Sequence, residues 1–185
     1  MTVAYRRKRE SKTNYNKRLK LLISHKTRVV IRKSLKNIMV QFVNFDPKGD
    51  VIVANANSIQ LLKLGWKYSR NNLPAAYLTG LLAGKTAVEK GVKEAIVDLG
   101  MNESVKGCKL YSSIKGIIDS GVKINCSKEI LPSDERIVGK HIAAYANLLK
   151  EKGEIDKKFS SMVKNNIDAS KIEESFNDIK KKILG

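Results

Sequence analysis

Basic side chains crowd the stretch YRRKRESKTNYNKRLKLL at residues 5–22, where aromatic and amide side chains are interleaved with them. The stretch holds eight Lys or Arg residues and a single acid, Glu10, together with two tyrosines and three Asn or Thr residues. Arginine forms paired hydrogen bonds to phosphate oxygens, and tyrosine rings stack on unpaired bases. Like charges at this density repel one another unless a polyanion compensates them, so this mixture indicates a phosphate polymer as its partner.

The basic charge is concentrated near the N-terminus. Of a net charge of +18, residues 1–36 contribute +12, whereas residues 37–185 contribute only +6. This asymmetry predicts a basic arm in front of a more balanced globular body. The chain has 185 residues, of which 42% are hydrophobic, so one domain with a substantial core is expected.

Nucleic acid, an anionic membrane and an acidic protein are the usual partners of such an arm. The sequence has no apolar run long enough to span a bilayer, no signal-peptide pattern and no apolar interfacial face in the arm. We therefore expect a nucleic-acid partner, with no membrane and no small-molecule substrate. Cys108 and Cys126 form no disulfide framework, which predicts an intracellular protein with reduced thiols.

The elements that must position the basic residues begin with the arm itself. Residues 1–14 are polar, and we expect them to be disordered when free. From Tyr15, apolar residues at helical spacing predict a short helix that buries one stripe on the domain. An antiparallel meander follows, with its second turn marked by Pro47 and Gly49. Its strands are expected over residues 28–34, 37–46 and 50–57.

Helices and short strands are expected to alternate after the meander. The predicted helices cover residues 71–91, 107–121, 133–153, 154–166 and 168–184, and the predicted strands cover residues 94–100 and 122–125. Gly80 and Gly84 would let the first of these helices lie close to the sheet. The order predicts an α/β fold with a mixed sheet. The expected parts are an RNA-binding arm (1–14), a globular domain (15–150) and a helical C-terminal extension (151–185).

Catalytic and metal sites are not expected. The segment GLLAGKT has three residues between Gly80 and Gly84 where a phosphate loop needs four, and it lies inside a predicted helix. His25 and His141 have no ligands at metal-binding spacing, so neither a metal nor a cofactor is predicted. Nothing here indicates an enzyme.

An RNA-processing hydrolase nevertheless stays open as an alternative, because nucleases on mixed sheets hold magnesium with clustered carboxylates. It would require Asp46, Asp98 and Asp119 to converge on one point.

A second polar cluster, GWKYSRNNLPAAY, precedes the helix predicted from residue 71. Asn71 is expected to cap that helix, whose N-terminus could receive a phosphate. Trp66 can equally fill the edge of the core, and Tyr15 can equally belong to the apolar stripe of its helix.

Several segments together resemble the uL18 family of large-subunit ribosomal proteins in order and spacing. They are YRRKRESKTNYNKRLKLL, NNLPAAYLTGLLAGKTAVEKG, AIVDLGMN, GCKLYSSIKGIIDSG and ERIVGKHIAAYA. The helices after Lys150 resemble the archaeal branch. The resemblance implies a ribonuclease-H-like α/β sandwich without catalytic carboxylates. It also implies a structural, ribosome-bound protein of the cytoplasm that binds 5S rRNA and attaches it to large-subunit rRNA in the central protuberance, beside neighbouring ribosomal proteins.

Residue chemistry and the resemblance together give the expected RNA contacts. They are Tyr5, Arg6, Arg7, Lys8, Arg9, Lys12, Tyr15, Lys17, Arg18, Lys20, Arg28, Arg32, Lys67, Arg70, Asn71, Asn72 and His141. A non-ribosomal RNA chaperone is the remaining alternative, and binding to any RNA without preference for 5S rRNA would favour it.

Overall fold

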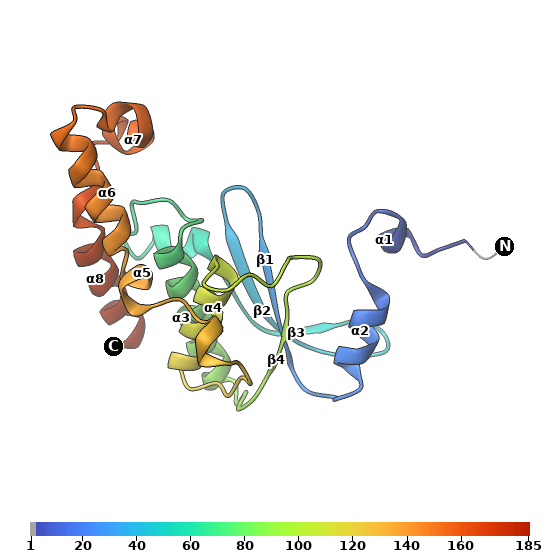
Figure 1. Ribbon diagram of the computed structural model, residues 1–185. Helices are drawn as coiled ribbons and strands as arrows, with labels where there is room; N and C mark the ends of the chain where they lie inside the picture. The colour runs from blue at the N-terminus through green and yellow to red at the C-terminus, as the bar shows by residue number, and fades with distance from the viewer. Residues whose placement is uncertain (1–2) are drawn as a thin grey trace.

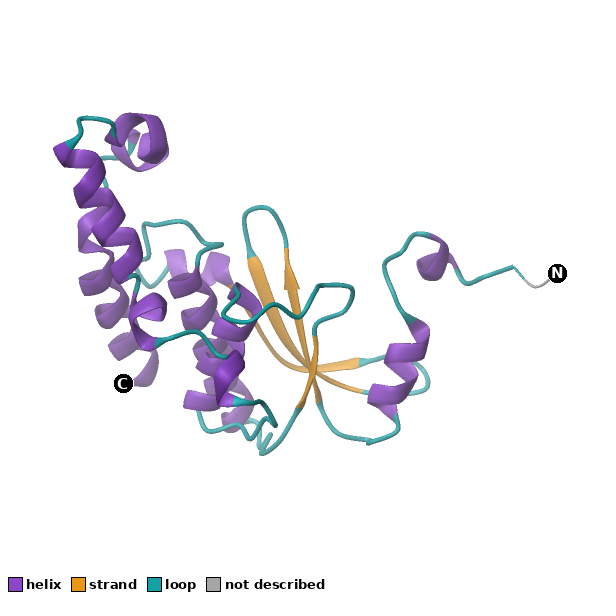
Figure 2. Cartoon of the chain, viewed as in Figure 1, coloured by secondary structure: helices purple, strands orange, loops and turns teal. Residues whose placement is uncertain are grey.

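The computed structural model describes residues 3–185, and within them the central sheet has four strands in the order β3-β2-β1-β4 (Figures 1 and 2). They are β1 (Arg28–Lys33), β2 (Ile38–Asn44), β3 (Val51–Asn57) and β4 (Ile96–Asp98). The first three form the predicted antiparallel meander, and β4 joins β1 in parallel. The prediction of an α/β fold with a mixed sheet is confirmed, while the finer ribonuclease-H-like description stays a prediction.

Alternation along the strands separates the two faces of the sheet. Ile38, Val40 and Phe42 of β2 are fully buried on one face, which packs on helices. Met39 and Gln41 lie between them and belong to the opposite face, here called the open face. The hairpin between β2 and β3 closes where predicted, with the Gly49 N–H donating to the Asp46 carbonyl at 3.0 Å.

Helices α3 (Leu73–Glu89) and α4 (Lys109–Asp119) cover the buried face. Asn72, rather than the predicted Asn71, caps α3 by accepting a hydrogen bond from the Ala75 N–H at 2.9 Å. A Cβ on Gly80 would overlap the Ser113 carbonyl oxygen, and one on Gly84 would overlap the Ser120 side chain. The two glycines of α3 therefore bring it against α4, while the small residues Ala76, Ala83 and Ala87 of the same helix pack in the core with the sheet.

Helices α5 (Asp134–Val138), α6 (Lys140–Glu151), α7 (Ile155–Lys164) and α8 (Ile172–Leu184) form an outer layer beyond α3 (Figure 1). The structure also contains the 3-10 helices η1 (Ser58–Leu62), η2 (Lys128–Ile130) and η3 (Ala169–Lys171). The prediction of one helix over residues 133–153 is wrong, because Gly139 adopts a left-handed conformation (φ +99°) and separates α5 from α6. α8 packs on α3, and its Phe176 ring lies 5.5 Å from the Tyr77 ring.

The strand predicted over residues 122–125 is also wrong. In the described chain this segment makes only an isolated parallel bridge between Lys123 and Glu94. Four residues with a single bridge do not extend the sheet, which therefore ends at β4.

The N-terminal segment lies on the opposite side of the sheet from α3 and α4 (Figures 1 and 2). It contains α1 (Arg6–Arg9) and α2 (Tyr15–Leu22), and Asn14 caps α2 through the Lys17 N–H at 3.0 Å. The predicted apolar stripe is covered only in part, because Tyr15 and Leu22 are half-buried whereas Leu19 is 64% exposed and Ile23 is 69% exposed. Residues 1–2 of the predicted arm lie outside the described residues, and the ordering of the arm on RNA stays a prediction.

Candidate nucleic-acid interface

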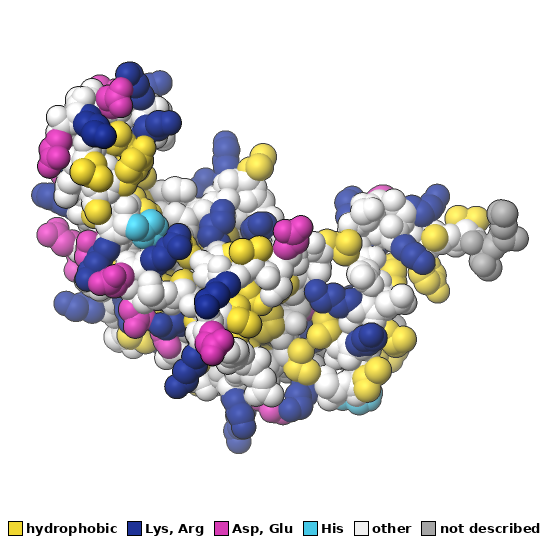
Figure 3. Space-filling model, viewed as in Figure 1, with side chains coloured by type: hydrophobic (Ala, Val, Ile, Leu, Met, Phe, Trp, Pro, Cys, Tyr) yellow, Lys and Arg dark blue, Asp and Glu magenta, His cyan; other side chains and the backbone are white. Residues whose placement is uncertain are grey.

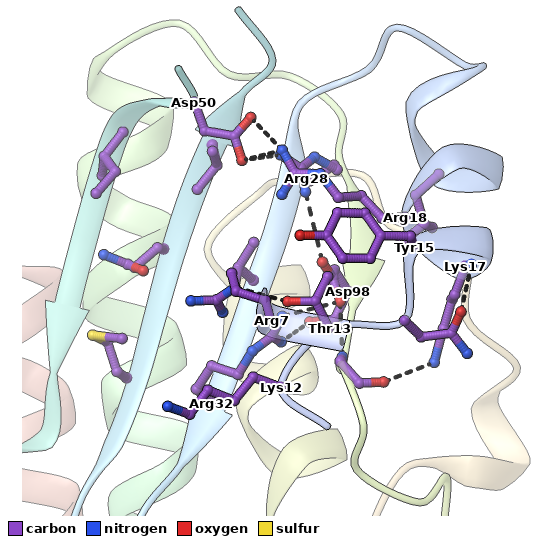
Figure 4. Close-up of a pocket in the computed structure, with 18 residues that line it drawn as sticks. Arg7, Lys12, Thr13, Tyr15, Lys17, Arg18, Arg28, Arg32, Asp50 and Asp98 are labelled. Atoms are coloured by element: carbon purple, nitrogen blue, oxygen red, sulfur yellow. Dashed lines mark hydrogen bonds and ion pairs between the residues drawn. The ribbon is translucent and has the colours of Figure 1, made fainter. Parts of the chain in front are cut away.

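A groove of about 640 Å³ lies between the N-terminal segment and the open face of the sheet (Figure 4). We call it the arm groove. Its basic lining residues are Arg7, Lys12, Lys17, Arg18, Arg28 and Arg32. Its floor consists of side chains from β1, β2 and β3, namely Val30, Met39, Gln41, Val43 and Ile52. The groove thus combines cationic walls with a largely apolar floor.

The strand alternation that builds the core also builds this floor. Because Val29 and Ile31 turn toward the helices, Arg28, Val30 and Arg32 turn toward the open face. In Figure 3, hydrophobic side chains are visible where α2 meets the sheet, and Lys and Arg side chains lie among them.

Asp50 joins the N-terminal segment to the sheet. Its carboxylate accepts hydrogen bonds from Arg18 of α2 at 2.9 and 3.0 Å and from Arg28 of β1 at 2.7 Å. One acid therefore fixes two arginines from different elements, and it holds α2 over the sheet although α2 itself is poorly buried.

Asp98, at the end of β4, pairs with two arginines of β1, Arg28 and Arg32. It lies 3.7 Å from Arg28 Nη1 and 3.3 Å from Arg32 Nη2, and its backbone carbonyl accepts from Arg32 Nη1 at 2.7 Å. Three arginines thus share two carboxylates, so the cluster keeps a positive charge after all these pairs have formed. Paired in this way, Arg18 and Arg32 are held in fixed positions at the edge of the groove.

Arg28 departs from its expected role as an RNA contact. Its side chain is 2% exposed and lies beneath Asp50 and Asp98, so the guanidinium does not reach solvent. A buried charge is tolerated only when it is paired, and here it orients the two acids that hold Arg18 and Arg32. Its Nε is buried and has no hydrogen-bond partner among residues 3–185.

The groove gathers many of the predicted contacts. Arg7, Lys12, Tyr15, Lys17, Arg18, Arg28 and Arg32 all line it. Figure 4 shows the Tyr15 ring directed from α2 toward the sheet, and the exposed Tyr5 ring packs on it with 5.1 Å between centroids. Lys17 Nζ donates to the Gly100 carbonyl at 3.2 Å. Arg6, Lys8, Arg9 and Lys20 are exposed on the same N-terminal segment, outside the groove lining.

The second cluster, before α3, has a largely structural role. Trp66 is buried in the core and its Nε1 donates to the Ser69 carbonyl at 3.0 Å. The Asn71 amide donates to the carbonyls of Ser34 and Leu35, both at 3.0 Å, and accepts from Lys109 Nζ at 3.1 Å. Burial, reinforced by the nearby Lys33, lowers the pKa of Lys109.

The remaining predicted contacts lie outside the arm groove. Lys67 is exposed and Arg70 is half-buried in the loop before α3. His141 lies on α6 in the outer layer, where burial and Arg136 lower its pKa. The structure therefore does not bring these three residues together with the N-terminal segment.

The three carboxylates that a hydrolase would require are each engaged elsewhere. Asp46 accepts from the Lys48 N–H in its own turn at 2.8 Å, Asp98 pairs with arginines, and Asp119 accepts from the Tyr77 hydroxyl at 2.6 Å. Within residues 3–185, no three His, Cys, Asp or Glu side chains come together to hold a metal ion. In the same residues, no helix is both long enough and apolar enough to cross a membrane.

The sequence interpretation missed the acids and the floor of the groove. No binding role is predicted from the sequence for Asp50, and Asp98 is considered only as one of the three acids that a hydrolase would require. Gln41 carried a usable signal, since it is a polar residue in the middle of β2 that alternates with buried apolar neighbours. The parallel pairing of β4 with β1, which places Asp98 beside Arg28 and Arg32, left no comparable local signal.

Comparisons with known proteins agree with one another. A family model described as "Ribosomal large subunit proteins 60S L5, and 50S L18" matches residues 1–94. The large ribosomal subunit protein uL18 of Korarchaeum cryptofilum is 46% identical over 181 residues, which cover 98% of this chain and 93% of that protein. The proteins of the same name from Thermofilum pendens and Desulfurococcus amylolyticus are each 45% identical over 183 residues, with the same coverage.

Proposed function

The chain belongs to the uL18 family of large ribosomal subunit proteins, in its archaeal form, and from this premise we propose that it binds 5S rRNA. In this proposal it attaches 5S rRNA to large-subunit rRNA in the central protuberance, beside neighbouring ribosomal proteins of the cytoplasmic ribosome. The observation that carries the proposal is the arm groove, where five basic side chains stand around the open face of the sheet and a sixth, Arg28, is buried beneath them.

The proposed role is structural. The exposed arginines and lysines of α1 and α2 neutralise phosphates, and the paired rings of Tyr5 and Tyr15 offer a stacking surface for unpaired bases. Arg18 and Arg32 are already oriented by Asp50 and Asp98, so less conformational entropy is lost when they meet RNA. None of these steps needs a metal, a cofactor or a catalytic group.

Removing residues 1–14 tests the proposal. No residue of α1 is buried, so the truncated chain keeps its core. We expect weaker binding to 5S rRNA and a flatter dependence of log affinity on log salt, with each lost phosphate contact changing the slope by roughly 0.7–0.9. Filter binding or fluorescence anisotropy over a salt series measures both quantities.

The control is an unrelated RNA of the same length. Equal affinity and slope with and without the arm would contradict the proposal. Equal binding of the intact protein to both RNAs would favour an RNA chaperone instead.

A further inference from the structure

We propose that the arm groove receives a single unpaired nucleotide of the bound RNA. Its base lies on the floor of the groove and its phosphate lies between the basic side chains of the walls. The inference rests on the proposed function, because it assumes that RNA is the ligand of this face. Beyond the proposed function, the inference specifies which part of the RNA enters the arm groove and which side chains hold it.

The size of the groove limits what can enter. Its volume of about 640 Å³ falls within the roughly 300–1,000 Å³ of typical small-ligand sites. A nucleotide fits within such a volume, whereas a stacked and paired RNA helix does not. The base that enters must therefore come from a loop, a bulge or an end.

The floor has the chemistry of a base-binding surface. Met39 and Ile52 offer apolar area, and the Ile52 side chain is 50% exposed on the open face. Gln41 lies among them, and its amide carries both donors and an acceptor for the edge of a base. The side of the groove toward α2 carries Tyr15, whose half-buried ring can stack on a base.

The walls have the chemistry of a phosphate site. Arg18 and Arg32 stand at the edge of the groove and are each held by a carboxylate. Arg7 Nε donates to Thr13 Oγ1 at 2.9 Å, which positions a third guanidinium at the lining. Below them, the buried Arg28 adds positive charge beneath the walls without itself reaching the surface of the groove.

The combination favours a nucleotide over other occupants. Cationic walls oppose a basic ligand, and the Asp and Glu side chains of an acidic peptide supply no flat ring to cover the apolar floor. The groove also lies on a face of the sheet rather than at its edge, so a peptide cannot join it as an added strand. A nucleotide satisfies floor and walls at once, because its base is flat and its phosphate is anionic.

Gln41 offers a test with a matched control on the same face. Asn55 of β3 pairs directly across from Gln41, yet it is not part of the groove lining. Gln41→Glu and Asn55→Asp introduce the same charge without a change in side-chain size, one inside the groove and one beside it. Gln41→Trp and Asn55→Trp repeat the comparison by filling space.

Affinity for 5S rRNA and chemical footprinting of the RNA in the saturated complex provide the readouts. We expect Gln41→Glu and Gln41→Trp each to weaken binding about tenfold or more, because either change displaces the base from the floor of the groove. We also expect one unpaired nucleotide, protected by the original protein, to become reactive. The Asn55 variants should change affinity less than threefold and leave the footprint intact.

Wild-type affinity and an unchanged footprint in both Gln41 variants would overturn the inference and leave the proposed function standing. Failure of the unaltered protein to bind 5S rRNA would instead overturn the proposed function, and the inference with it. Thermal unfolding of all four variants separates a loss of binding from a loss of fold.

Discussion

The helices α2 and α8, near opposite ends of the chain, are both amphipathic, and they make opposite use of their apolar sides. α8 buries Ile172, Phe176, Ile179 and Ile183, each at most 3% exposed. In α2, none of the residues Tyr15–Leu22 is fully buried, and Leu19 is 64% exposed. The same helical spacing therefore accompanies a core helix in one case and a surface helix in the other.

Charge distinguishes the two helices better than hydrophobic spacing does. The first turn of α8 carries Glu173 and Glu174, and its last turn carries Lys181 and Lys182, which matches the helix dipole. The first turn of α2 has no acid, and the charged residues that neighbour α2 in sequence are almost all basic. Balanced charge suits a helix completed by its own chain, whereas unbalanced basic charge suits one completed by a polyanion.

Truncating one apolar side chain in each helix tests most directly whether α8 is a core helix and α2 a surface helix. Phe176→Ala should lower the free energy of unfolding by about 3–5 kcal/mol, because it opens a cavity between α8 and α3. Leu19→Ala should change it by less than about 0.5 kcal/mol, since the side chain is exposed. Urea unfolding measures both, and equal losses would show that α2 docks in solution as α8 does.

The next largest loss of stability is expected when Asp50, which attaches α2 to the sheet, is changed. Asp50→Asn should lower the free energy of unfolding by about 1–3 kcal/mol, because the buried Arg28 loses part of its charge compensation. It should also speed amide hydrogen exchange in α2, which Arg18 and Asp50 hold to the sheet.

Asp46→Asn is the matched control for that change. It lies in the same hairpin, removes the same charge and still accepts from the Lys48 N–H. If the amide hydrogens of α2 exchange at the same rate in both variants, Asp50 does not hold α2 to the sheet.

Removing two basic residues from each end compares their contributions to RNA binding. The double change Arg6→Ala and Arg7→Ala should reduce the salt-dependence slope of 5S rRNA binding by about 1.4–1.8, if each side chain contacts one phosphate. The double change Lys181→Ala and Lys182→Ala should leave the slope nearly unchanged, because acids offset charge in α8. Because Arg6 and Arg7 belong to α1, similar slopes for the two variants would remove the distinction between the basic N-terminal segment and α8.

The smallest effect concerns the ion pair that ties η3, just before α8, to α6. Hydrogen bonds from Lys150 and Ser170 hold the pKa of Asp168 well below its usual value of 3.8. A carboxyl whose pKa is depressed by folding stabilises the protein above its unfolded pKa, and this contribution is lost as the pH falls below about 4.

Asp168→Asn should therefore cost less than about 1 kcal/mol at pH 7, because the pair is exposed. It should also flatten the fall in unfolding free energy below pH 4. Glu154→Gln, which removes a different exposed pair with Lys157, serves as the comparison. If the unfolding free energy of Asp168→Asn falls below pH 4 as steeply as that of the original protein, the depressed pKa of Asp168 does not contribute to acid unfolding.

Local patterns predicted local structure well. The strands at 28–33, 38–44 and 51–57 lie within the predicted ranges, because alternation and the Pro47–Gly49 turn are encoded by neighbouring residues. The helix over 73–89 was likewise predicted, including the exclusion of a phosphate loop at Gly80. Other features did not follow from local patterns. The glycines of α3 contact α4, which is distant in sequence, and Gly139 adopts a left-handed conformation inside an apolar pattern that is continuous in sequence.

The candidate site shows the same contrast between what local sequence predicts and what long-range contacts determine. The basic residues of the N-terminal segment could be recognised from composition, since their charge is uncompensated within the sequence. The burial of Arg28 could not, because it depends on Asp50 from a hairpin and Asp98 from a parallel strand. Sequence therefore indicated the ligand class, whereas tertiary pairing determined which arginines remain free to meet it.

The position of the groove along the chain also determines when its residues are synthesised relative to the C-terminal helices. All of its lining residues lie between Arg7 and Gly100, so the first part of the chain to be synthesised contains the whole groove. At about 5–20 residues per second, α8 emerges several seconds later and packs on the far side of α3. A nascent chain therefore carries every residue that lines the proposed RNA site before its C-terminal helices are synthesised.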